Sequence, residues 1–109
     1  MSAIFTQDID EGFWNYENTK LKTIKDKYKE MNGVVEYILK ENIKKNNLNI
    51  DLDTIKKIIM TFNMIIALLK DYQQKIDILP FIIQKGKNYM KKHGFEFYSL
   101  FKEVGIILE

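Results

Sequence analysis

Apolar side chains recur at intervals of three and four residues along most of this 109-residue chain, and no other feature limits its fold as strongly. Two interleaved series within residues 53–79 repeat every seven residues: Ile55, Phe62, Leu69 and Ile76, and Ile58, Ile65, Tyr72 and Leu79. This spacing places side chains on one stripe of an α-helix. Because further apolar residues surround the stripe, we predict the buried central helix of a bundle here, with Asp53 as its N-cap.

A second recurrence runs through the N-terminal third: Trp14, Leu21, Tyr28 and Val35, with Ile24, Met31 and Ile38 offset by three. It predicts a helix that begins near Asp8 and continues towards residue 45. An unbroken helix of this length would measure about 57 Å, whereas a compact domain of this size has a radius of gyration of about 13 Å. We therefore favour a break or sharp bend at Asn32-Gly33, both of which accept a left-handed backbone. A continuous helix would instead give an elongated, dimeric molecule.

Two further helices are expected in the C-terminal half. One runs from Ile78 to Lys92 with Pro80 in its first turn, where proline is tolerated. The other runs from Glu96 to Leu108 and has one apolar face: Phe97, Leu100, Phe101, Val104 and Leu108. The alternation of apolar and polar residues that would indicate β-strands is weak throughout. We predict an all-α fold in one domain spanning residues 1–109, namely a small antiparallel bundle of four to five helices, with a long N-terminal helical hairpin as an open alternative within it.

The composition argues against catalysis. Cysteine is absent, which excludes disulfides, thiol catalysis and cysteine-bound zinc. His93 is the only histidine, and it directly precedes Gly94 at a predicted helix end, where a structural role is typical. Serine occurs only at positions 2 and 99, so a nucleophile–base pair has little to be built from. We expect a protein that is not an enzyme and has no cofactor and no metal site.

No signal peptide is evident, and the most apolar run, Ile58 to Leu69, has 12 residues where a membrane span needs about 20. We therefore expect a cytoplasmic protein without a transmembrane segment. All 17 basic residues are lysines, and isoleucine and asparagine are abundant, a bias typical of an AT-rich genome.

Aromatic residues exceed what a minimal core requires, and the C-terminal end is apolar. Such residues anchor many protein interfaces. Our candidates for contact with a partner are Trp14, Tyr16, Phe95, Tyr98, Ile106 and Ile107. The leading hypothesis is a non-enzymatic helical interaction or assembly protein, which binds a protein partner or itself, as an oligomer or coiled coil, through apolar helix faces.

Two alternatives use the lysines. A nucleic-acid-binding accessory subunit would use a lysine-rich segment with one aromatic residue: Lys85, Lys87, Tyr89, Lys91 and Lys92. The absence of arginine argues against sequence-specific DNA reading, and the net charge of +2 is small. An immunity-type protein acting by peripheral contact at the inner membrane face would need a basic amphipathic helix with an exposed apolar face.

Overall fold

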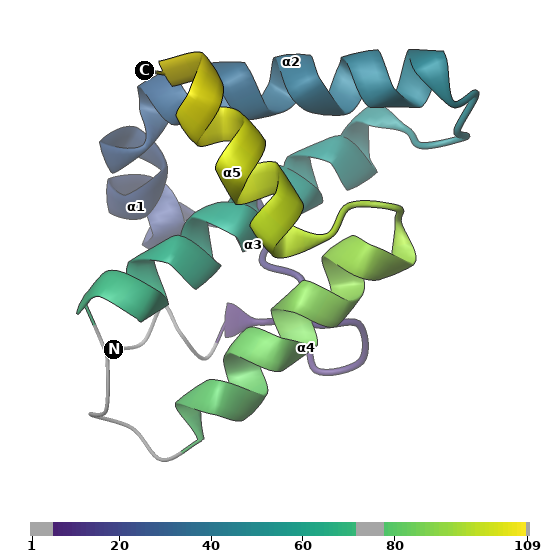
Figure 1. Ribbon diagram of the computed structural model, residues 1–109. Coiled ribbons are helices and arrows are strands. Elements are labelled where there is room, and N and C mark those ends of the chain that lie inside the picture. The colour runs from purple at the N-terminus through teal and green to yellow at the C-terminus, as the bar shows by residue number, and fades with distance from the viewer. Residues whose placement is uncertain (1–5, 72–77, 109) are drawn as a thin grey trace.

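The computed structural model of the chain describes residues 6–71 and 78–108 (Figure 1). These residues form a 3-10 turn and five α-helices: η2 (Thr19–Leu21), α1 (Lys22–Lys27), α2 (Lys29–Lys45), α3 (Leu52–Asp71), α4 (Leu79–Lys92) and α5 (Phe97–Leu108). Within those ranges there is no β-strand. The predicted all-α bundle is confirmed, and the radius of gyration is 13.2 Å.

The central helix is α3, in which every residue from Ile58 to Leu68 is buried. Helices α1, α2 and α4 pack against it, and the Phe62 ring lies 5.3 Å from the ring of Phe97 on α5. Figure 1 shows the chain reversing direction between α2 and α3 and again between α3 and α4. Burial on all sides explains why this segment is apolar all round. None of the described helices is long and apolar enough to cross a membrane.

The N-cap of α3 is Asp51, not Asp53 as predicted. The Thr54 backbone N–H donates to Asp51 Oδ1 at 2.8 Å, and the pKa of the Asp51 carboxyl is lowered by hydrogen bonding to Thr54, first to its side chain and then to its backbone. Asp53 instead lies in the first turn and pairs with Lys57 at 3.0 Å. The predicted continuation of this helix through Tyr72 and Ile76 falls outside the described residues.

The N-terminal arm, residues 7–18, consists of turns and extended backbone, so the helix predicted to begin near Asp8 is not formed. Trp14 nevertheless lies fully buried, and its backbone N–H donates to Thr61 Oγ1 at 3.1 Å. Gly12 permits this course because its φ is +92° and a Cβ there would come within 2.5 Å of the Lys85 carbonyl oxygen. The arm therefore lies against the α4 backbone and places Trp14 in the core from outside any helix.

The predicted break at Asn32-Gly33 is also wrong, because both residues lie inside α2. The chain bends instead at Tyr28, whose φ and ψ of −106° and 22° end α1. The Asn32 side chain is 8% exposed, and its Nδ2 donates to the Lys25 carbonyl across the bend at 3.5 Å. Leu21, Tyr28 and Val35 all remain buried. The seven-residue recurrence thus continues through the bend, because α1 and α2 both pack against α3.

Helix α4 has Pro80 in its first turn, as predicted; Asp77, a possible cap for it, lies outside the described residues. The helix ends at Lys92, and two residues later Gly94 turns the backbone with a φ of +93°, so that the Phe95 N–H donates to the Met90 carbonyl at 3.0 Å. This reversal sends the chain into α5. Glu96 caps α5, because its carboxylate accepts hydrogen bonds from the backbone N–H groups of Tyr98 and Ser99.

Three of the five residues predicted on the apolar face of α5 are buried, namely Phe97, Leu100 and Val104. Phe101, the fourth described member of this predicted face, is 48% exposed. It lies 100° round the helix from Leu100, at the edge of the buried stripe, and its ring stacks on Phe97. The Leu108 side chain is outside the described part.

Candidate functional site

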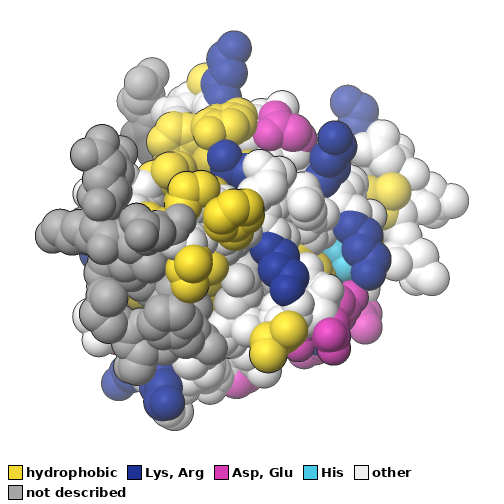
Figure 2. All heavy atoms as spheres, turned by 90° about the horizontal axis from the view of Figure 1, so that it is seen from below, with side chains coloured by type: hydrophobic (Ala, Val, Ile, Leu, Met, Phe, Trp, Pro, Cys, Tyr) yellow, Lys and Arg dark blue, Asp and Glu magenta, His cyan; other side chains and the backbone are white. Residues whose placement is uncertain are grey.

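The clearest candidate site is an aromatic and basic surface on α4 and α5. Phe81 on α4 is 76% exposed, and Tyr98 and Phe101 on α5 are 58% and 48% exposed. We call the exposed aromatic side chains of these two helices, with three of their lysines, the α4–α5 surface. It is defined by six residues: Phe81 in the first turn of α4, and Lys87, Lys91, Tyr98, Phe101 and Lys102 further along α4 and on α5. Figure 2, which views the molecule from the α4 side, shows hydrophobic side chains gathered mainly on one half of the face and lysines spread over both halves.

Lys87 joins the two helices at the centre of the α4–α5 surface. Its Nζ donates to the Tyr98 hydroxyl at 2.9 Å and lies 4.3 Å from the centroid of the Tyr98 ring. The same ammonium contributes to the lowered pKa of the Glu96 carboxyl, although the Tyr98 backbone N–H is the larger cause. Tyr98 is therefore held in position by contacts within the chain.

Both exposed α5 rings rest on Phe97, which is only 2% exposed. The Tyr98 ring lies 5.2 Å from that of Phe97 at a steep angle, and the Phe101 ring stacks on Phe97 at 6.0 Å with planes 16° apart. Aromatic side chains fixed in this way lose little conformational freedom on binding. The arrangement is therefore suited to contact with another molecule.

The charge along the exposed face of α4 changes in one direction. Phe81 lies near its beginning, the uncharged Gln84 and Asn88 follow, and Lys91 and Lys92 lie in the last turn. Residues 79–92 contain no Asp or Glu. On α5, positions 98, 101 and 102 share one helical face by their spacing. The α4–α5 surface thus combines aromatic side chains with positive charge.

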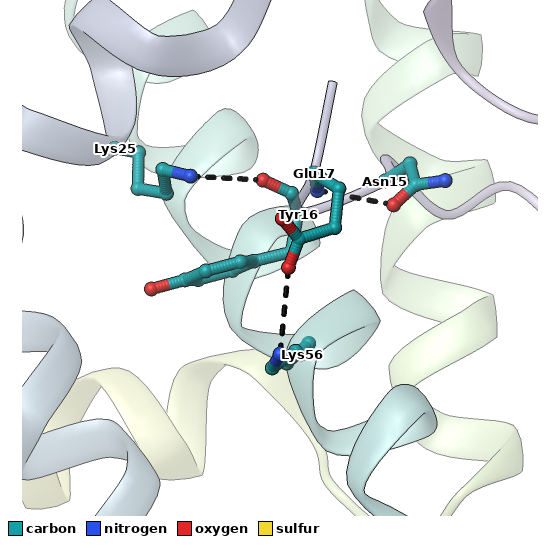
Figure 3. A network of polar contacts seen from close by, with 5 residues as sticks. All are labelled: Asn15, Tyr16, Glu17, Lys25 and Lys56. Atoms are coloured by element: carbon teal, nitrogen blue, oxygen red, sulfur yellow. Dashed lines mark hydrogen bonds and ion pairs between the residues drawn. The ribbon is translucent and has the colours of Figure 1, made fainter. Parts of the chain in front are cut away.

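A second polar cluster surrounds Tyr16 (Figure 3). Lys25 Nζ donates to the Tyr16 carbonyl at 3.2 Å and lies 4.4 Å from the ring centroid. Lys56 lies 5.9 Å from the same centroid and pairs with Glu17 at 3.4 Å, and Asn15 Oδ1 accepts from the Glu17 N–H. Two lysines thus approach the predicted interface residue Tyr16 and attach the N-terminal arm to α1 and α3.

A hollow of about 300 Å³ lies beside this cluster and is lined by Tyr16, Lys25, Asp26, Lys29, Asn32, Gly33, Glu36 and Ile59. Asn32 Oδ1 has no hydrogen-bond partner, but it exposes less than 1 Å² and is not accessible from the hollow. The lining charges have both signs. The Tyr16 cluster is therefore best explained as an attachment of the arm.

The other predicted partner-binding residues are divided between core and surface. Trp14 is fully buried and Phe95 is 6% exposed, so neither offers its ring to a partner in this fold. Ile106 is 65% exposed, and the Ile107 side chain lies outside the described part. Of this predicted set, Tyr98 alone belongs to the α4–α5 surface.

The predicted nucleic-acid-binding segment does not form one open basic face. Tyr89 is 3% exposed, and burial raises its pKa. Lys85 donates to the Ile9 carbonyl of the N-terminal arm, Lys92 pairs with Glu11 at 3.0 Å, and Lys87 is engaged with Tyr98. Lys91 is exposed. These side chains diverge from one another and leave no ring within the segment on which a base could stack.

His93 is half-buried at the end of α4, where its ring lies 4.7 Å from that of Tyr89. Burial, and then the neighbouring Lys92, lower the pKa of the imidazole. The described residues hold no group of three His, Cys, Asp or Glu side chains that could bind a metal ion. The Ser99 hydroxyl donates to Glu96 at 3.0 Å, within the α5 cap.

Sequence reasoning missed Phe81 and Phe101 as site residues. Phe81 shares its helix face with Gln84 and Asn88, and two polar neighbours at helical spacing were a signal that this face meets solvent. Phe101 carried no such signal, since it fits the edge of a buried stripe.

No protein-family model matches this chain, and neither do the curated proteins or the solved structures with which it was compared.

Proposed function

We propose that this chain is a non-enzymatic helical interaction protein that binds a protein partner through the α4–α5 surface. One observation carries the proposal: Phe81, Tyr98 and Phe101 are each about half exposed or more, and the two α5 rings are fixed on the buried ring of Phe97. Interfaces draw most of their binding energy from a few such aromatic anchors.

The energetics favour contact with a partner. An aromatic side chain buries about 150–250 Å² when it is fully covered, and burial of apolar area contributes about 25 cal/mol per Å². Because the half-exposed rings have much of that area still in water, covering them would contribute several kcal/mol before the entropy cost of association. Their prior attachment to Phe97 and Lys87 reduces that cost.

Site-specific photo-crosslinking tests this function. A benzophenone amino acid replaces Phe101 in one variant and Tyr37 in another, and both are expressed in the cell that naturally makes the protein. Tyr37 is 61% exposed on α2 and serves as the matched control. We expect a discrete cross-linked protein from position 101 and none from position 37.

Equal labelling from both positions, or no product from either, would contradict the proposal. Size-exclusion chromatography with light scattering on the purified chain then separates the two kinds of partner. A dimer that cross-links to itself through position 101 identifies a second copy, and a monomer with a cross-linked product of different mass identifies another protein.

The nucleic-acid and membrane alternatives have less support. Three of the four lysines of the predicted segment already contact other groups of the chain. Binding of single-stranded nucleic acid that weakens steeply with salt would favour the first alternative, and co-sedimentation with anionic liposomes would favour the second.

A further inference from the structure

We infer that the occupant of the α4–α5 surface is an acidic amphipathic helix of another protein, an inference that rests on the proposed function above. The positive charge of the surface favours this occupant over a second copy of the chain. Lys91 lies one turn after Lys87 on α4 and Lys102 follows Phe101 on α5, and in the described part of the chain neither lysine makes an ion pair.

Acidic side chains that could neutralise this surface are engaged elsewhere or absent. Helix α4 contains none. Glu96 is occupied as the cap of α5, and Glu103 lines a hollow on the α2 side of α5, together with Glu41, Asn42, Lys44 and Lys45. Glu96, although engaged as the cap, still offsets part of the charge of Lys87, whereas Lys91 and Lys102 make no ion pair in the described part of the chain. The surface therefore presents two unpaired ammonium groups close to exposed aromatic side chains.

A second copy would fit this surface poorly. Two copies related by twofold symmetry place the same patch of each chain in contact. Because this patch carries Lys87, Lys91 and Lys102, its pairing with itself would bring two patches of net positive charge together, and like charges across an interface are costly. A partner with carboxylates removes this repulsion and supplies ion pairs.

Nucleic acid also carries negative charge, but it fits less well because one face of each α5 ring is already covered by the chain itself. Base stacking requires an open ring face. One face of Tyr98 is covered by the Lys87 ammonium at 4.3 Å, and Phe101 stacks on Phe97. Apolar side chains from a helix can instead pack on the exposed edges and the remaining face.

A helix matches the spacing of the groups. Lys87 and Lys91 lie one turn apart on α4, and Tyr98, Phe101 and Lys102 lie on one face of α5. A helix laid along the two would meet this surface with apolar residues at spacings of three and four and with carboxylates on the side facing the lysines. The partner segment is thus defined by the helical spacing of its apolar residues and by its negative charge.

The test uses displayed random peptides of about 15 residues, long enough for four helical turns, selected on the full-length chain. Three forms are compared: wild type, K91E/K102E and Y98A/F101A. Lys91 and Lys102 are exposed and have no described contacts to lose, so the charge-reversed form keeps its fold, which circular dichroism checks. Wild type should enrich peptides that are net acidic and carry Leu or aromatic residues at helical spacing.

A synthetic peptide of the enriched sequence should bind K91E/K102E at least about tenfold more weakly than wild type, and Y98A/F101A should lose it. Enrichment of uncharged apolar peptides equally by wild type and K91E/K102E would overturn the acidic partner and leave the proposed function intact. Selected peptides that bind Y98A/F101A normally would overturn the proposed function itself. A wild-type dimer abolished by F101A would identify a second copy and overturn the inference.

Discussion

Two aromatic groups of similar composition differ in burial: Phe13-Trp14-Tyr16 near the N-terminus and Phe97-Tyr98-Phe101 in α5. Trp14 is fully buried, whereas Tyr98 and Phe101 are about half exposed. In the first group, Trp14 belongs to the core and Phe13 and Tyr16 are partly buried against it. In the second group, Phe97 is buried and Tyr98 and Phe101 stay at the surface. Aromatic content therefore indicates the capacity for burial, while the tertiary structure determines which group the fold itself covers.

The difference follows from backbone shape. The N-terminal arm is irregular, so it can adapt its course to the groove over α3 and α4 until Trp14 is enclosed. Gly86 of α4 leaves space for the Trp14 ring, because a Cβ at position 86 would come within 3.2 Å of Trp14 Cζ3. Helix α5 is rigid and turns 100° per residue, so burying Phe97 and Leu100 fixes Tyr98 and Phe101 at or beyond the edge of the core.

Replacing Trp14 should give the largest effect. We expect Trp14→Ala to lower the free energy of unfolding by about 3–5 kcal/mol, because it removes a large, fully buried ring and leaves a cavity. Urea denaturation followed by circular dichroism measures the change. A loss below about 1 kcal/mol would show that the arm does not hold Trp14 in the core, and the comparison would fail.

Thr61→Val should have the next largest effect. It retains the shape of the side chain but removes the acceptor of the Trp14 backbone N–H, so a buried donor is left unpaired at a cost of about 1–3 kcal/mol. Thr61→Ser keeps the hydroxyl and is the control for that hydrogen bond. If the two variants have equal stability in urea, the hydrogen bond does not anchor the arm.

The double variant Y98A/F101A should change stability least among the aromatic replacements, by about 1 kcal/mol or less, because both side chains are largely in solvent. The same variant should lose the cross-linked partner almost completely. Parallel urea denaturation and capture experiments measure both quantities. A loss of stability as large as that of Trp14→Ala would place these rings in the core and remove the basis for the proposed function.

The smallest expected effect is on the pH dependence of stability. The lowered pKa of Glu96 means that its carboxylate stabilises the fold fully above its usual value of 4.5, and that this contribution is lost as the pH falls through the lower, folded-state pKa. Glu96→Gln should therefore flatten the acid side of the stability profile, measured as the melting temperature across that range. Identical profiles for wild type and variant would show that the cap contributes no pH dependence.

Periodicity was sufficient to predict the fold class, the buried α3 and the position of Pro80, because helical stripes are local in sequence. It failed at the arm, where Trp14 fits a helical recurrence yet reaches the core through a contact with Thr61, 47 residues away. It failed again at Phe101, since one step round a helix separates a buried side chain from a half-exposed one. Neither the bend at Tyr28 nor the lysine–tyrosine contact between α4 and α5 has a local signature.

Hydroxyl-radical footprinting of the free chain, read residue by residue by mass spectrometry, tests the contrast between the two aromatic groups most directly. The structure predicts rapid oxidation of Tyr98, Phe101 and Phe81 and strong protection of Trp14, despite the high intrinsic reactivity of an indole ring. Rapid oxidation of Trp14 together with protection of Tyr98 and Phe101 would contradict the account.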